Sequence, residues 1–251
     1  MAHHVQFQWR AYDTVRYPIP SGPISFFTDE APSSPERVTD KVEAEIISWL
    51  LRTPPARDLL FANLELPETT YAQVSVIEPI LDRKPTKKPG DLDVLLLPLV
   101  ADPSRAISIQ AKRVKVEAIT THRDAVSNRH LGNLTDLIEQ ANGSRELGFH
   151  LNYAMVVVQI DGMERSEFNF LARTTTPGQF SRIYHRAWDS PLHSDVGMIF
   201  VEISQPTGAS IDNAGFIAVC VDKRAKPIEQ PTSLTAKVRQ LTSTRAPCDI
   251  E

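Results

Sequence analysis

Residues 89–116 read PGDLDVLLLPLVADPSRAISIQAKRVKV and contain two apolar segments, each of which also carries charged or polar side chains. Successive side chains of a β-strand point to opposite faces, so Asp91 and Asp93 share one face at the start of the first segment. In the second segment Gln110 and Lys112 share a face, about 6.6 Å apart along the strand. A polar turn separates the segments and predicts an antiparallel hairpin. We therefore expect Asp93, Gln110 and Lys112 to meet in one cleft.

A carboxylate, an amide oxygen and a lysine form a set that is suited to phosphodiester hydrolysis. Carboxylate and amide oxygens are hard ligands for Mg²⁺, which lowers the pKa of a bound water and neutralises charge on phosphoryl oxygens. A lysine can stabilise the negative charge that develops during the reaction. Each motif alone also has a structural interpretation, because Gly-Asp-x-Asp often forms a turn before a strand and lysines on a strand often protect a sheet edge.

The order and spacing of these motifs resemble a nuclease family. Gly-x-x-Asp, apolar strand, loop and Gln-x-Lys resemble the PD-(D/E)XK superfamily, and IQAKR at residues 109–113 is similar to Mrr-type restriction endonucleases, in which Gln replaces the more usual Glu. The resemblance covers roughly residues 36–160. It implies that Asp93 and Gln110 are metal ligands and that Lys112 is the catalytic lysine. It also implies an endonuclease that depends on Mg²⁺ or Mn²⁺ and acts in bacterial restriction or antiphage defence.

A helix ahead of these strands carries two further acidic residues. Ser34 and Pro35 suit the start of a helix that should run to about Leu51. Its apolar stripe consists of Val38, Val42, Ile46, Trp49 and Leu50. Glu45 falls within this stripe and Glu43 lies at its margin, and a carboxylate on a buried face needs a partner. Because the corresponding helix of the resembled superfamily often supplies a metal ligand, Glu45 is the candidate catalytic residue and Glu43 the reserve. Both can also be boundary residues of an amphipathic helix.

The remaining pattern predicts an α/β fold with a mixed central sheet flanked by helices, a restriction-endonuclease-like core with a C-terminal extension. We expect an extended arm over residues 1–35 and a single domain over 36–251, with its core at about 36–160 and C-terminal strands and helix over 161–251. The expected strands are 71–80, 153–160, 196–203 and 215–221, and the expected helices start at Asn133, cover 164–188 with a break at 176–178, and cover 233–241.

Charge is spread unevenly along the chain. The whole sequence of 251 residues has a net charge of −4, yet residues 83–129 hold ten Lys and Arg against five Asp and Glu, a local net charge of +5. Such a basic stretch beside the proposed site can contact phosphates, or it can be a solvated face. The candidate nucleic-acid-binding residues are Lys84, Lys87, Lys88, Arg113 and Lys115.

Composition and termini favour a cytoplasmic protein. No apolar stretch approaches the roughly 20 residues that span a bilayer, so no membrane partner is expected. The sequence MAHHVQFQWR at the N-terminus lacks the features of a signal peptide. Cys220 and Cys248 are too few for a disulfide framework and are expected to be structural thiols.

The sequence therefore predicts a Mg²⁺-dependent or Mn²⁺-dependent endodeoxyribonuclease whose partner is DNA. Because the overall charge is negative, tight DNA binding should require a homodimer or a partner protein of a defence system. Two alternatives stay open. The chain can be a nuclease-fold subunit that binds nucleic acid or acts as a scaffold without cutting independently, or it can be an α/β structural protein in which the motifs are coincidental.

Overall fold

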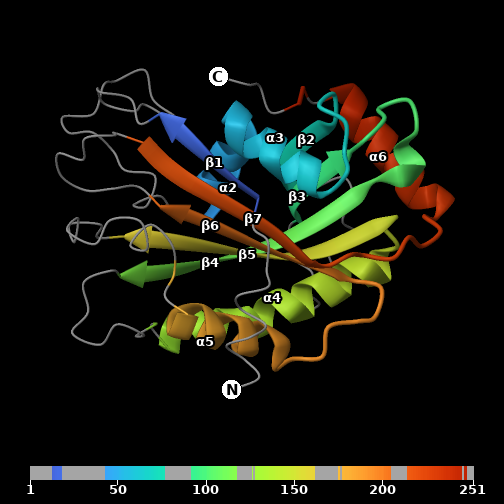
Figure 1. The fold of residues 1–251 in the computed structure, drawn as a ribbon. Helices are drawn as coiled ribbons and strands as arrows, with labels where there is room; N and C mark the ends of the chain where they lie inside the picture. Colours follow the sequence, from blue (N-terminus) through green and yellow to red (C-terminus); the bar gives the residue numbers. More distant parts are fainter. Residues whose placement is uncertain are drawn as a thin grey trace.

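A mixed β-sheet of seven strands forms the centre of the described part of the chain (Figure 1). The computed structural model describes residues 13–18, 43–76, 92–117, 126, 128–161, 175, 177–204, 214–244 and 246–247. The strands are β1 (Asp13–Pro18), β2 (Tyr71–Val76), β3 (Leu92–Leu97), β4 (Ile107–Glu117), β5 (Leu151–Asp161), β6 (Gly197–Ser204) and β7 (Ala214–Lys223). Their order across the sheet is β1-β7-β6-β5-β4-β3-β2.

Strands β4, β5 and β6 are parallel, and helices connect them. Helix α4 (Asn128–Leu147) lies between β4 and β5 in the chain, and α5 (Pro177–Trp188) lies between β5 and β6, as parallel neighbours require. The other neighbouring pairs are antiparallel. The predicted hairpin of β3 and β4 is confirmed, and its turn contains the short 3-10 helix η2 (Pro103–Arg105). There the Asp102 carboxylate accepts a hydrogen bond from the Ser104 amide.

Helices cover both faces of the sheet (Figure 1). On one face, α2 (Glu43–Arg52) packs against β2, β3 and β4, and α3 (Pro54–Asn63) packs against β1 and β7. On the other face, α4 packs against β4 and β5, and α5 lies beside α4. Helix α6 (Thr232–Thr244) packs against residues of β2 and β3. The predicted α/β class, a mixed central sheet flanked by helices, is therefore confirmed.

Three apolar clusters hold these layers together. Three residues of the stripe expected for α2, Ile46, Trp49 and Leu50, are buried against the sheet. The other two, Val38 and Val42, and the expected helix start at Ser34 and Pro35 lie outside the described residues. Apolar stripes on α4 and α6 are buried as well, and they comprise Leu134, Leu137, Ile138 and Ala141 on α4 and Leu234, Val238 and Leu241 on α6. The burial of apolar surface on both faces of the sheet is the main favourable contribution to folding here.

The start of one helix differs from the expectation. Helix α4 begins at Asn128 instead of Asn133, because polar residues can form the first turns of a helix whose later turns pack on the sheet. It ends at Leu147 before Gly148, whose φ of 92° suits a glycine that terminates a helix. A Cβ atom at Gly148 would also lie 2.6 Å from Pro231 Cδ.

The chain on both sides of the expected core joins the same sheet. Residues 13–18, expected within an extended arm, form the edge strand β1 and pair with β7. The C-terminal strands β6 and β7 continue the sheet beyond β5. Within the described ranges, no helix has the length and apolar character needed to cross a membrane.

Candidate functional site

Strands β3 and β4 separate at the residues that the sequence singled out. Their ladder contains the pairs Val94–Ile109, Leu95–Ser108 and Leu96–Ile107. The next pair would join Asp93 to Gln110, and it is absent from the ladder. Strand β4 nevertheless continues to Glu117, paired with β5 along its other edge. We call the region where β3 leaves β4 at Asp93 and Gln110 the β3–β4 fork.

Two carboxylates bind the amide groups that this separation leaves on the edge of β4. Asp93 Oδ2 accepts a hydrogen bond from the backbone N of Ala111 at 2.7 Å. Glu43 Oε2, from α2, accepts one from the backbone N of Arg113 at 2.8 Å. These amides are two residues apart on one strand edge, about 6.6 Å along the strand. The carboxylates therefore take consecutive positions that the carbonyl oxygens of a neighbouring strand would otherwise occupy.

Lys112 completes this arrangement. Its Nζ donates a hydrogen bond to Glu43 Oε1 at 2.8 Å, and the two groups form an ion pair. The side chains are 18% and 32% exposed respectively, so the pair is partly exposed to solvent. Glu43 thus uses one oxygen to hold the strand and the other to hold the lysine.

The acid of α2 that contacts Lys112 is Glu43, which the sequence analysis kept in reserve. Glu45 lies two residues further along the helix and is partly exposed. Residues 43 and 45 are about 200° apart around a helix, since each residue of an α-helix turns by about 100°. The two side chains therefore point to different sides of α2. The contact geometry favours Glu43 as the acidic residue of the site.

The side chains of Gln110 and Lys112 contact different helices. Its Nε2 donates to Ser144 Oγ of α4 at 3.0 Å, and both residues are 1% exposed. Lys112 shares its parity on the strand, but its long side chain ends at Glu43 of α2, on the other helical layer. This is possible because β3 no longer covers the edge of β4 at this point. Asp93 contacts the edge of β4 through the Ala111 amide and Lys112 contacts Glu43, whereas the Gln110 amide nitrogen is bound to Ser144 of α4.

A polar pair beside the fork was missed by the sequence analysis. Arg113 Nη1 donates to Gln159 Oε1 at 3.3 Å, and Gln159 of β5 is fully buried. The signal was a single polar residue in YAMVVVQI, an otherwise apolar strand. Because a buried amide must be hydrogen-bonded, such a residue identifies a position where a polar partner is near.

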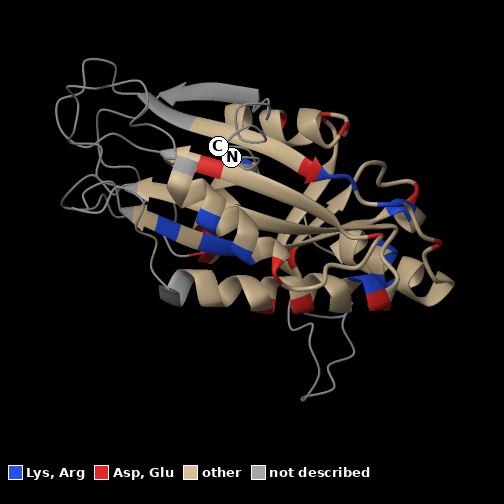
Figure 2. Cartoon of the chain, turned by 60° about the horizontal axis from the view of Figure 1, so that its bottom comes forward, with Lys and Arg blue, Asp and Glu red and all other residues tan. Residues whose placement is uncertain are grey.

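Basic residues follow one another on β4 at this end of the sheet (Figure 2). Lys112, Arg113 and Lys115 are all partly buried. The other candidate DNA-binding residues, Lys84, Lys87 and Lys88, lie outside the described residues. Among the described cations of β4, Lys112 therefore contacts a carboxylate of the fork, and the Arg113 guanidinium contacts Gln159.

The donor set at the fork suits a hard divalent cation. Mg²⁺ is usually bound through one or two carboxylates, with water and substrate phosphates as the remaining ligands. Asp93 and Glu43 supply two carboxylates along one strand edge. Among the described residues, no group of three or more His, Cys, Asp or Glu side chains is placed to hold a metal ion.

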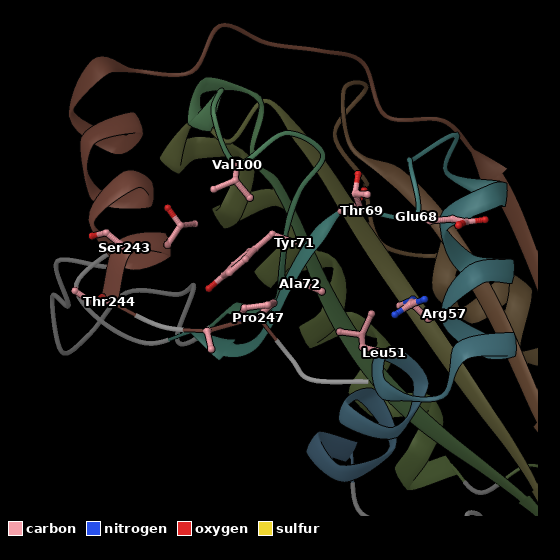
Figure 3. A pocket seen from close by; sticks show the side chains of 13 residues that line it. Leu51, Arg57, Glu68, Thr69, Tyr71, Ala72, Val100, Ser243, Thr244 and Pro247 are labelled. Atoms are coloured by element: carbon pink, nitrogen blue, oxygen red, sulfur yellow. The ribbon is translucent and has the colours of Figure 1, made fainter. Parts of the chain in front are cut away.

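A pocket of about 620 Å³ lies elsewhere, between the end of α2, the start of β2 and the C-terminal end of α6 (Figure 3). Its wall includes Leu51, eight residues from Glu43 along α2 and so about 12 Å away. Figure 3 shows Tyr71 between Leu51 on one side and Ser243 on the other. Several of its polar groups are bonded within the protein, because Arg57 pairs with Asp58 and the hydroxyls of Thr242, Ser243 and Thr244 bond to helix carbonyls. None of the candidate site residues lines it.

Comparison of the chain with protein-family models, curated proteins and solved structures finds no match.

Proposed function

We propose that the β3–β4 fork is the active site of a Mg²⁺-dependent endodeoxyribonuclease. One observation carries the proposal: Asp93 and Glu43 occupy consecutive hydrogen-bonding positions on the edge of β4, and Lys112 lies against Glu43. A strand pair that serves only to build a sheet would continue its ladder with main-chain groups. Two carboxylates and a lysine at its opening instead provide an anionic pair for a metal and a cation for a phosphate.

Each residue then has a separate task. Asp93 and Glu43 would hold the cation, which when bound lowers the pKa of a water and neutralises charge on the scissile phosphate. Hydrolysis forms a bond between the water oxygen and phosphorus and breaks the bond to the leaving sugar oxygen. Lys112 Nζ would stabilise the negative charge that develops on the phosphoryl oxygens during this exchange. Gln110, held by Ser144, would keep the start of this part of β4 in place.

The basic side chains of β4 support a polyanionic substrate. Arg113 follows Lys112 directly and Lys115 lies three residues after it, and the Arg113 guanidinium is oriented by Gln159. Such residues contact phosphates whatever the base sequence, and binding through them weakens as the salt concentration rises. The resemblance of IQAKR to the Mrr-type enzymes adds DNA as the substrate and restriction or antiphage defence as the setting of the proposal.

The test is to incubate the purified chain with plasmid DNA and with labelled DNA and RNA oligonucleotides, with Mg²⁺, with Mn²⁺ and with EDTA. Wild type should cut DNA only with a divalent cation, Asp93→Asn should abolish cutting, and Lys112→Met should slow cutting by about 10²-fold to 10³-fold. Matched controls are Asp102→Asn in the turn of the same hairpin and the exposed Lys226→Met, which should cut as wild type does.

Two results would contradict the proposal. Equal cutting by Lys112→Met and wild type would remove the fork from catalysis. Salt-sensitive DNA binding without cutting under every condition would favour the alternative, a nucleic-acid-binding subunit that retains the nuclease fold.

A further inference from the structure

Regular strand geometry is interrupted on both sides of Asp93. On the β4 side the ladder ends at Val94. On the β2 side, Val74 pairs with Val94 and Val76 pairs with Leu92, but the intervening pair of Ser75 and Asp93 is missing. The register before and after the gap is the same, so no residue is inserted. The interruption is therefore a local change of backbone conformation centred on one pair of residues.

Ser75 has the unusual backbone conformation at this position. Its φ is 50°, in the left-handed region that residues with a Cβ atom rarely adopt. Its side chain is exposed, so packing does not account for the conformation. Residues held in this region cluster at functional sites, where the surrounding structure maintains them.

The side chains of both strands change faces at this pair. In β2, Val74 packs against the cluster under α2 and α3, whereas Val76, of the same parity, belongs to the cluster under α6. In β3, Val94 belongs to the first cluster and Leu92 to the second. Residues two apart on a regular strand would share a face. The sheet therefore reverses its alternation at Ser75 and Asp93.

This reversal determines where the Asp93 carboxylate lies. In a regular strand Asp93 would share the face of Leu95 and Leu97, which are fully buried in the apolar cluster with α6. A carboxylate there would lose its hydration without compensation. Instead Asp93 Oδ2 lies within hydrogen-bonding distance of the Ala111 amide, toward the neighbouring strand β4.

We propose that Ser75 is a positioning residue for Asp93: its left-handed backbone conformation turns the Asp93 carboxylate out of the apolar cluster and into the β3–β4 fork. The importance of this for catalysis rests on the proposed function, but the positioning itself is a property of the fold. Ser75 is not assigned any contact with substrate.

The primary test is hydrogen exchange of the Ala111 amide, followed by NMR or by mass spectrometry of peptides that contain this residue. Ser75→Val places a β-branched residue where φ must be positive, which disfavours the native conformation. The Ala111 amide should then exchange about 10-fold to 100-fold faster, as expected for loss of a hydrogen bond to a charged acceptor. Ser75→Gly, which adopts positive φ readily, should exchange as wild type does.

The controls separate positioning from a general loss of stability. Gln73→Val makes the same kind of change two residues earlier on β2, at a position without positive φ, and should leave the exchange of Ala111 unchanged. If Ser75→Val does not fold, the comparison of Ser75→Ala with Ser75→Gly replaces it, because only alanine disfavours the left-handed region. Unchanged protection of Ala111 in Ser75→Val, or equal protection in the Ala and Gly variants, overturns the inference.

A second readout connects this inference to the proposed function. Mn²⁺ affinity, measured by calorimetry, should fall about 10-fold to 100-fold in Ser75→Val, the usual loss when the support of a metal ligand is removed, and it should be retained in Ser75→Gly. If Ala111 loses protection in Ser75→Val but wild type binds no Mn²⁺ and cuts no DNA, the positioning role holds and the proposed function fails. If Asp93→Asn loses Mn²⁺ and Ser75→Val retains both Mn²⁺ and Ala111 protection, only the role of Ser75 fails.

Discussion

Replacing Lys112 by methionine should make metal binding tighter and DNA cutting slower. The Lys112 ammonium donates to Glu43 Oε1 at 2.8 Å, so a cation that uses the Glu43 carboxylate must compete with this ion pair. Methionine keeps much of the length and apolar character of the lysine stem but carries no charge. In the Lys112→Met variant Glu43 still accepts the Arg113 amide, so the carboxylate stays in place.

The expected magnitude follows from the exposure of the pair. Exposed ion pairs contribute at most about 1 kcal/mol, and a hydrogen bond to a charged group contributes about 1.5–3 kcal/mol. With 18% and 32% of the two side chains exposed, we take about 1–2 kcal/mol for the contact. Since about 1.4 kcal/mol corresponds to a tenfold change, Mn²⁺ should bind about 5-fold to 30-fold more tightly. Cutting should fall by about 10²-fold to 10³-fold, as when one donor to a developing oxyanion is lost.

The assay is calorimetric titration of wild type, Lys112→Met and the control Lys226→Met with Mn²⁺, together with cleavage of a plasmid at saturating metal. Opposite changes in affinity and rate would be difficult to obtain from partial unfolding, which lowers both. Unchanged or weaker Mn²⁺ binding by Lys112→Met, with an intact fold, would refute the reasoning that Lys112 competes with the metal for Glu43.

Three further predictions concern the acid of α2, a buried carboxylate and the basic residues. Glu43→Gln should weaken Mn²⁺ binding and cutting, and Glu45→Gln should change neither; the opposite result in the same titration would return the ligand role to Glu45. Burial raises the pKa of Glu202, although the Thr175 hydroxyl and amide donate to its carboxylate. A raised folded-state pKa means that Glu202 favours the folded state most below its unfolded-state pKa and that this contribution is lost as the pH rises through the folded-state pKa. As the pH rises from the unfolded-state pKa through the folded-state pKa of Glu202, the unfolding free energy of Glu202→Gln should therefore increase relative to that of wild type. Denaturant titrations at several pH values measure this difference. An absent or opposite trend would contradict the reasoning. Replacing Lys84, Lys87 and Lys88, ahead of β3, by alanine should reduce the salt dependence of DNA binding. The slope of log K against log salt should become shallower by up to about 0.9 for each phosphate contact removed. An unchanged slope would exclude these lysines from DNA contact.

Local patterns were sufficient for most of the secondary structure. The apolar stripe of α2, the hairpin of β3 and β4, and the buried run in β5 were all predictable, because the periods of helix and strand are properties of neighbouring residues. Strand β1 was expected only as part of an extended arm. Its pairing with β7 joins residues 13–18 to residues about 200 positions later, and no local pattern encodes such a partner.

The candidate site was predictable in its residue types and less so in its geometry. Asp93 and Lys112 were expected together, and both contribute to the fork. The choice between Glu43 and Glu45 could not be made from periodicity, because it depends on how α2 is rotated as it crosses β4. Gln110 shares strand parity with Lys112, but parity does not predict that Gln110 contacts α4 while Lys112 contacts α2.

The sequence by itself determined which segments form strands and helices and which polar residues interrupt the apolar runs, since these depend on side-chain size, polarity and spacing. Only the tertiary structure decided where the β3–β4 ladder ends, that carboxylates replace main-chain acceptors there, and that Ser75 adopts a positive φ. Serine has no intrinsic preference for that conformation, so only its surroundings can maintain it. The physical reason is that strand register and strand separation arise from packing between distant segments, whose combined contacts override the preference of any single residue.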